Sequence, residues 1–297
     1  MQKTVPQVLA KTMPAQASLY IVATPIGNLD DFTQRAIEVL KSVDVLAAED
    51  TRHSKKLLQH YQINVPLVSY HDHSGSDDTK KLIGLLKEGK SIGLVSDAGT
   101  PLISDPGYRL VREARQEGIS VIPIPGASAL TAALSVSGLP TDRFSFEGFL
   151  PSKQPARIKK LEQLKSDSRT LVFYESPHRV EASLGDMASV FGEIREAFIG
   201  RELTKKFESH FFDELQACLQ WVKSDSNNQK GEFVFVVAGN SDIDDEDRKL
   251  QQAMAIVRLL GKDLSMKRAV ALASEISGAR KNQLYDAALK EMNSEKD

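Results

Sequence analysis

Two acidic side chains, Asp97 and Asp105, lie in a loop rich in glycine and proline at residues 96–107, SDAGTPLISDPG. An apolar run at residues 92–95 precedes the loop, and residues at helical spacing follow it from position 108. Glycine lets a backbone approach a ligand closely, and proline stiffens the chain. A plain strand-to-helix connector needs only about two to six residues. The length and composition of this loop therefore favour a binding site.

A second group of ionisable residues, EDTRH at residues 49–53, follows the apolar run at residues 43–48. Asp50 or Thr51 is expected to cap the next helix, because both side chains accept hydrogen bonds from a first helical turn. The remaining members of this group are candidates for contact with a substrate.

Two other patterns do not predict sites. GLLKEGKS at residues 84–91 matches the phosphate-loop consensus, but the expected order of helix, glycine and strand reverses the strand, loop and helix that such a site requires. Gly89 is better explained as the residue that ends a helix. His71 and His73 have a spacing that could ligate a metal, but no cluster of further ligands accompanies them, so no metal site is predicted.

Composition indicates a cytoplasmic globular protein. The chain has 297 residues, which suggests about two domains, and 41% of them are hydrophobic. Its net charge of −2 supplies no general basic field for nucleic acid. Cys218 is the only cysteine, which fits a reducing compartment. No apolar run is long enough to span a membrane, and residues 1–17 are expected to form a disordered tail.

Strands and helices alternate through residues 18–140, which predicts a parallel sheet with helices on both faces. The ends of four strands, at Thr24, Glu49, Ser96 and Pro125, would then lie along one edge of the sheet. Open α/β sheets bind ligands at this edge.

Residues 141–240 predict a second α/β domain with a less regular pattern, including strong strands at residues 170–175 and 232–238. The aromatic residues 207–212 could form a hairpin strand or precede a helix. Residues 241–297 predict an acidic linker and a small helical module, with two short helices that meet at Gly278.

The motifs resemble those of the tetrapyrrole-methylase superfamily. More closely, they are similar to its branch that methylates the ribose 2′-oxygen of a cytidine in the 16S RNA of the small ribosomal subunit. Where tetrapyrrole-modifying members have Gly-Asp-Pro in the central loop, this chain has Ser96-Asp97-Ala98, which favours the RNA branch. The motifs that carry the resemblance are TPIGNL (24–29), AEDTR (48–52), VSDAGTPLISDPG (95–107), PGASA (125–129) and FYESPHR (173–179).

The resemblance implies two α/β domains with S-adenosylmethionine in the cleft between them, a homodimer, and the small ribosomal subunit as partner. The residues that would line the cofactor site by motif are Pro25, Asp97, Thr100, Ser128, Ala129, Glu175 and Ala238.

Methyl transfer to a ribose hydroxyl requires the oxygen to lie about 3–3.5 Å from the methyl carbon, in line with the bond that breaks. A general base or a polarising cation assists because the hydroxyl is weakly acidic. Glu49, His53 and Asp105 are candidates for the base, and Arg52 for the cation.

Two groups of basic residues are candidates for phosphate contacts. They are Lys153, Arg157, Lys159 and Lys160 after the domain boundary, and Lys267, Arg268, Arg280 and Lys281 in the helical module. The alternatives are a solvated helix face for the first group and a plain helical cap for the second. Two other functions are also consistent with the sequence: methylation of a small tetrapyrrole, and non-catalytic binding of RNA or a nucleotide.

Overall fold

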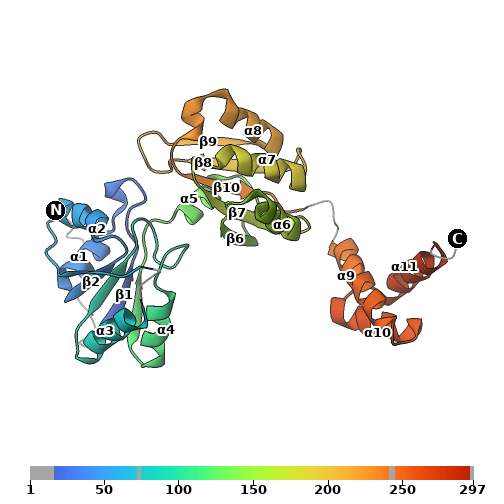
Figure 1. Cartoon of the computed structure of the whole chain (residues 1–297), viewed down its shortest axis with the longest axis horizontal. Coiled ribbons are helices and arrows are strands. Elements are labelled where there is room, and N and C mark those ends of the chain that lie inside the picture. The colour runs from blue at the N-terminus through green and yellow to red at the C-terminus, as the bar shows by residue number, and fades with distance from the viewer. Residues whose placement is uncertain (1–16, 72–74, 241–244, 295–297) are drawn as a thin grey trace, which may run out of the picture.

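The structure is a computed structural model that describes residues 17–71, 75–240 and 245–294. Figure 1 shows two α/β units and a separate helical module. Most of the expected tail, His73, and residues 241–244 of the acidic segment lie outside the described ranges.

The first unit is a five-stranded parallel sheet with strand order β3-β2-β4-β1-β5. Its strands are β1 (Ser18–Val22), β2 (Val45–Ala48), β3 (Leu67–Ser69), β4 (Ile92–Val95) and β5 (Ser120–Ile124). The connecting helices are α1 (Gln34–Ser42), α2 (Thr51–His60), α3 (Ser76–Lys87) and α4 (Tyr108–Gln116), with a short 3₁₀ turn η1 (Leu29–Asp31) before α1.

Apolar helix faces bury this sheet on both sides. Leu40 of α1 and Leu58 of α2 belong to one core cluster, and Leu82 of α3 and Leu110 of α4 belong to another. The prediction of a parallel sheet covered on both faces is therefore confirmed, and the carboxyl ends of β1, β2, β4 and β5 share one edge.

The second unit has strand order β6-β7-β10-β8-β9, in which only the β6–β7 pair is parallel. Its strands are β6 (Phe144–Phe149), β7 (Thr170–Glu175), β8 (Glu196–Arg201), β9 (Ser209–Glu214) and β10 (Phe233–Val237). Helices α6 (Gln154–Leu164), α7 (Val180–Phe191) and α8 (Leu215–Ser224) contribute to the core on one face, and a 3₁₀ turn η2 (Ser226–Gln229) follows α8. The aromatic segment thus does both things considered for it, since β9 pairs with β8 and leads into α8.

Helix α5 (Ala129–Val136) connects the two units. It follows the last strand of the first sheet in the chain, but Ala133 and Leu134 pack against Val172 and Val234 of the second sheet.

Helices α9 (Asp245–Leu260), α10 (Met266–Ser277) and α11 (Lys281–Ser294) form the helical module. Its core contains Ala253, Val270 and Leu284. Gly278 has φ = +72° and ends α10, so the predicted helix junction is confirmed. Among the described helices, none combines the length and apolarity needed to cross a membrane.

The rejection of a phosphate loop is also confirmed. Gly84 lies inside α3, whereas Gly89 follows that helix with φ = +90° and precedes β4. The residues that match the phosphate-loop consensus therefore lie at the end of a helix, whereas a phosphate loop lies at the start of one.

The single thiol, Cys218 in α8, is fully buried, and burial raises its pKa from 9.0 to about 12. We therefore expect no reaction of the folded protein with a thiol reagent at pH 8, and one equivalent after unfolding in guanidinium chloride. Because the folded-state pKa is the higher one, this thiol's contribution to the free energy of unfolding is complete below pH 9.0 and is lost as the pH rises toward about 12. Rapid labelling of the folded protein would contradict the buried assignment.

Candidate functional site: a cavity between the two sheets

A cavity of about 340 Å³ lies where loops of the first sheet face the second sheet. This volume is in the range of small-molecule sites. From the first unit, its walls are formed by Ile26, Ala98, Gly99, Thr100, Ile103, Ser104 and Asp105, and the start of α5 adds Ser128 and Ala129. From the second unit, they are formed by Phe149, Tyr174, Glu175, Ser176, Pro177, Leu203, Lys205, Glu232, Phe233 and Val234.

Backbone bonds hold the first-unit loops together. Thr24 and Gly99 exchange two N–H···O bonds, at 2.8 and 3.0 Å, which tie the loop after β1 to the central loop after β4. Thr100 Oγ1 donates to the carbonyl of Ala127 at 3.1 Å. Leu102 and Ser104 have φ values of +73° and +64°, a costly conformation that clusters at functional sites. The central loop is thus a fixed wall of the cavity.

Asp97 joins the cluster at residues 49–53. Its carboxylate accepts a hydrogen bond from the Asp50 N–H at 3.0 Å and lies 3.2 Å from His53 Nδ1. Its N–H donates to Glu49 Oε2 at 3.4 Å. This places Glu49, His53 and Asp97 together at the edge of the sheet, outside the cavity lining.

Asp50 has the capping role that was considered for it. Its side chain accepts from the Arg52 N–H at the start of α2 and also pairs with the Arg52 guanidinium at 2.6 Å. Hydrogen bonds from the side chain and backbone of Arg52 hold the pKa of Asp50 far below its usual range.

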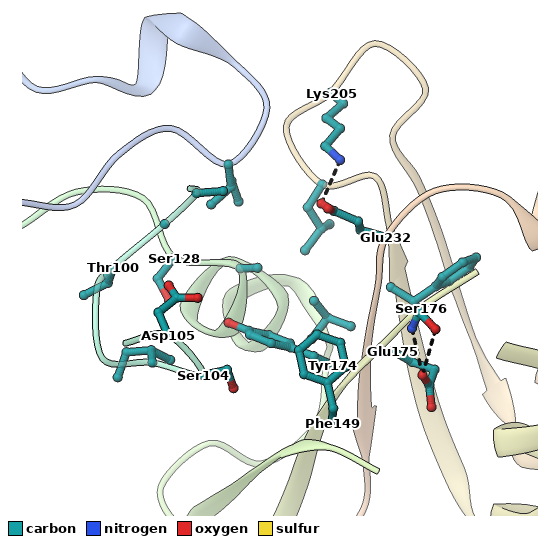
Figure 2. Close-up of a pocket in the computed structure, with 18 of the residues that line it drawn as sticks. Thr100, Ser104, Asp105, Ser128, Phe149, Tyr174, Glu175, Ser176, Lys205 and Glu232 are labelled. Carbon is teal, nitrogen blue, oxygen red and sulfur yellow. Dashed lines mark hydrogen bonds and ion pairs between the residues drawn. The ribbon is translucent and has the colours of Figure 1, made fainter. Parts of the chain in front are cut away.

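Tyr174 forms part of the opposite wall. Its hydroxyl accepts a hydrogen bond from the Leu130 N–H of α5 at 3.0 Å. Burial raises the pKa of Tyr174, so its phenol stays protonated at neutral pH. Figure 2 shows the ring between Phe149 and the start of α5.

Both carboxylate oxygens of Glu175 accept hydrogen bonds from nearby residues. One oxygen accepts from the Ser176 N–H at 2.8 Å and from two nitrogens of Arg179 at 2.9 and 2.6 Å, while the other accepts from Ser183 Oγ at 2.6 Å. Its side chain is fully buried. These bonds leave Glu175 a role in holding the turn after β7.

Lys205 of the second unit lies beside Gly27 of the first unit. Its ammonium lies 2.8 Å from carboxylate oxygens of both Glu202 and Glu232. Burial lowers the pKa of Lys205, but the hydrogen bonds to both carboxylates outweigh this effect and raise it. A Cβ on Gly27 would lie 2.2 Å from Lys205 Cγ, so glycine at that position leaves room for the lysine stem.

Five of the residues predicted for the site line this cavity: Thr100, Asp105, Ser128, Ala129 and Glu175. Pro25 and Asp97 are replaced in the lining by their neighbours Ile26 and Ala98. Ala238 is also absent, since it lies beyond the buried end of β10, where its carbonyl accepts from Arg195.

Sequence reasoning missed Phe149, Tyr174, Lys205 and Glu232. Only Tyr174 lies within a recognised motif, FYESPHR. The other three reach the cavity through tertiary packing. Within the described ranges, no three His, Cys, Asp or Glu side chains gather as metal ligands.

The expected phosphate contacts after the domain boundary require a correction. Arg157 is buried, and its Nε lies 2.6 Å from the carboxylate of Asp186. It therefore cannot serve as a surface contact for RNA. Lys160 pairs with Glu147 at 2.7 Å, whereas Lys153 and Lys159 are exposed. In the helical module, the four predicted basic residues, Lys267, Arg268, Arg280 and Lys281, are all exposed.

Two family models match the chain. Residues 18–218 match the model described as tetrapyrrole (corrin/porphyrin) methylases, and residues 248–292 match an RsmI C-terminal HTH domain. The second match coincides with the helical module.

Curated relatives match nearly the whole chain. Ribosomal RNA small subunit methyltransferase I of Pseudomonas aeruginosa is 50% identical over 272 residues, covering 92% of this chain and 96% of the relative. Its namesake in Escherichia coli O157:H7 is 50% identical over 277 residues, covering 93% and 96%. The Synechocystis namesake is 46% identical, covering 91% and 97%.

Solved structures share the fold at low identity. Uroporphyrin-III-C-methyltransferase of Thermus thermophilus has a TM-score of 0.54 at 18% identity, covering 75% of this chain and 94% of the other. A diphthine synthase has a TM-score of 0.56 at 16% identity, covering 75% and 90%. A complex of the Thermus thermophilus enzyme with S-adenosyl homocysteine has a TM-score of 0.51 at 17% identity, covering 75% and 97%.

The buried Arg157–Asp186 pair yields a prediction about stability. We expect Arg157→Leu to lower the free energy of unfolding by about 3–5 kcal/mol, because it leaves the Asp186 carboxylate buried without its cation. Lys159→Leu, at an exposed position of the same helix, should change it by less than about 0.5 kcal/mol. Urea titration followed by circular dichroism measures both, and equal effects would refute the structural role.

Proposed function

The chain belongs to the tetrapyrrole methylase family, and from this premise we propose that it methylates the RNA of the small ribosomal subunit with S-adenosylmethionine as donor. The observation that carries the proposal is the similarity of about 50% identity, over more than 90% of the chain, to ribosomal RNA small subunit methyltransferases. The acceptor is the ribose 2′-oxygen of a cytidine in 16S RNA.

Several lining residues suit the donor. Ile26, Ile103 and Val234 supply apolar wall for an adenine ring, and the carboxylate of Asp105 suits a cationic sulfonium. When bound, S-adenosylmethionine supplies an electrophilic methyl group on sulfur. Thr100, Ser128 and Ala129 are the proposed cofactor contacts that line this space.

Asp105 is the proposed general base, since it is the one candidate among Glu49, Arg52, His53 and Asp105 that lines the cavity. Its carboxylate would accept the proton of the ribose hydroxyl while that oxygen takes the methyl group that bound S-adenosylmethionine would supply. The ammonium of Lys205, held by two carboxylates, lies on the opposite wall. The protein contributes chiefly by positioning the acceptor oxygen in line with the methyl group.

The helical module distinguishes this proposal from methylation of a small tetrapyrrole. The tetrapyrrole-modifying structure cited above covers 75% of the chain, and a separate family model accounts for residues 248–292. Lys267 and Arg268 at the start of α10, and Arg280 and Lys281 at the start of α11, are the proposed RNA contacts of the module. We also propose a homodimer in the cytoplasm, where assembled subunits are available.

The direct test is incubation with methyl-labelled S-adenosylmethionine and either assembled small subunits or naked 16S RNA, both lacking the modification. We expect label on a ribose 2′-oxygen of a cytidine in 16S RNA. Label on a tetrapyrrole instead would support the alternative enzyme, and cofactor binding without turnover on any acceptor would support a binding protein.

Replacement of the proposed base should separate chemistry from binding. We expect Asp105→Asn to lower kcat by roughly 10²- to 10⁴-fold, because general base catalysis contributes on this scale. The Kd for S-adenosylmethionine, measured by calorimetry, should change less than about threefold. His53→Gln provides the comparison: a larger loss of kcat there would move the base to the His53–Asp97 pair.

Charge reversal in the helical module tests its role. We expect the double variant Lys267→Glu and Arg268→Glu to raise KM for the small subunit at least about tenfold and to reduce the dependence of KM on salt, because fewer counterions are released. Glu275→Lys on the same helix is the matched control. An unchanged KM in the double variant would leave the module without a role in RNA recognition.

A further inference from the structure

Phe149 is unusually exposed for a large apolar residue beside a cavity. It lies at the end of β6 with 54% of its surface accessible, and it lines the cavity between the two sheets. Its ring meets Tyr174 edge-to-face, with centroids 5.7 Å apart. Figure 2 shows the two rings side by side. One face of an aromatic wall therefore remains available to a ligand.

A β-bulge turns this side chain toward the cavity. In the β6–β7 register, Phe146 pairs with Val172, Gly148 with Phe173, and Phe149 with Tyr174, so Glu147 is the extra residue. Side chains alternate along a regular strand, and residues 146 and 149 would then point to opposite faces. The inserted residue restores Phe149 to the face of Phe146, and both rings contact Tyr174. Bulges are rare in parallel pairs and serve near active sites to re-aim a side chain.

The side-chain contacts of Glu147 and the conformation of Gly148 hold the bulge in place. The Glu147 carboxylate accepts hydrogen bonds from Lys160 at 2.7 Å and from Ser145. Burial raises the pKa of Glu147, but the bonds from Lys160 and Ser145 outweigh this effect and lower it. Gly148 has φ = +64°, and a Cβ there would lie 3.3 Å from Ser104 Oγ of the central loop. The bulge is thus held from the helix side by Lys160, and it closely approaches the first unit.

Two exposed lysines follow Phe149 in the chain. Lys153 precedes α6 and Lys159 lies within it, and both side chains face solvent. An aromatic face followed by cations on the same segment is the arrangement that binds an unpaired strand, because a base stacks on the ring while the cations meet its phosphates. The arrangement does not require a particular base sequence.

We propose that Phe149 is an acceptor-binding residue on which an unpaired nucleobase of the RNA stacks, so that the attached or adjoining ribose enters the cavity. This inference rests on the proposed function and adds a specific contact to it. The stacked base holds the nucleotide against the second-unit wall, while the donor occupies the space between the central loop and α5. Glu147 and Lys160 act as positioning residues, because they set the bulge without touching the RNA.

The experiment compares Phe149→Ala, Phe149→Leu and Phe149→Trp with the control Phe144→Ala in the full-length protein. Phe144 suits this purpose because it lies on the same strand and is 42% exposed, but it does not line the cavity. Assembled small subunits and labelled S-adenosylmethionine give kcat and KM, and calorimetry with S-adenosylmethionine alone gives the donor Kd.

We expect Phe149→Ala to lower kcat/KM for the small subunit by about 5- to 150-fold, the equivalent of one lost base–aromatic stack. Phe149→Leu should recover little of the loss and Phe149→Trp most of it, because stacking needs a π face and not only apolar bulk. Donor Kd should stay within about twofold in every variant, and Phe144→Ala should behave as the wild type.

Three results would overturn the proposal. Wild-type kinetics in Phe149→Ala would show that no base stacks there, and full recovery by leucine would reduce the residue to an apolar filler. A weakened donor Kd that accounts for the whole loss would assign Phe149 to the cofactor. If the wild-type protein labels no RNA, the proposed function fails and this inference fails with it; that outcome is distinct, because the first three require an active wild type.

Discussion

The packing of α5 on the second sheet is the interaction on which the site depends. This helix leaves the first sheet, buries Ala133 and Leu134 against the second, and presents Ser128 and Ala129 to the cavity. The bond from the Leu130 N–H to the Tyr174 hydroxyl joins the same helix to β7. The two walls are joined because one helix packs on the second sheet and also contributes to the cavity lining.

Several charged side chains of the second unit are held by hydrogen bonds and ion pairs within the protein. The Glu175 carboxylate, in the cavity wall, accepts hydrogen bonds from Ser176, Arg179 and Ser183, and outside the cavity lining Arg157 pairs with the carboxylate of Asp186. Such groups are costly to bury unless every hydrogen-bonding position is satisfied. The bonds to Glu175 stiffen the cavity wall at the end of β7, and a rigid wall holds a ligand at little entropic cost.

The two units position the residues that line the cavity in different ways. On the first unit, backbone bonds between Thr24 and Gly99 and left-handed residues at Leu102 and Ser104 hold a loop. On the second unit, the inserted strand residue Glu147, which pairs with Lys160, turns the Phe149 side chain toward the cavity. Both devices act on the backbone, which fixes where the lining side chains start.

The sequence by itself determined the parallel sheet, the second α/β unit, the helical module and the family, because hydrophobic period, turn residues and ordered motifs are local signals. The motifs also indicated Thr100 and Asp105 in the central loop and Ser128 and Ala129 at the start of α5, and all four line the cavity. Only the tertiary structure decided that Arg157 is buried, that Asp97 joins Glu49 and His53, and that Phe149 and Lys205 reach the cavity. The physical reason is that burial, ion pairing and a one-residue change of register depend on which distant segment lies opposite, and no local pattern of residues encodes that neighbour.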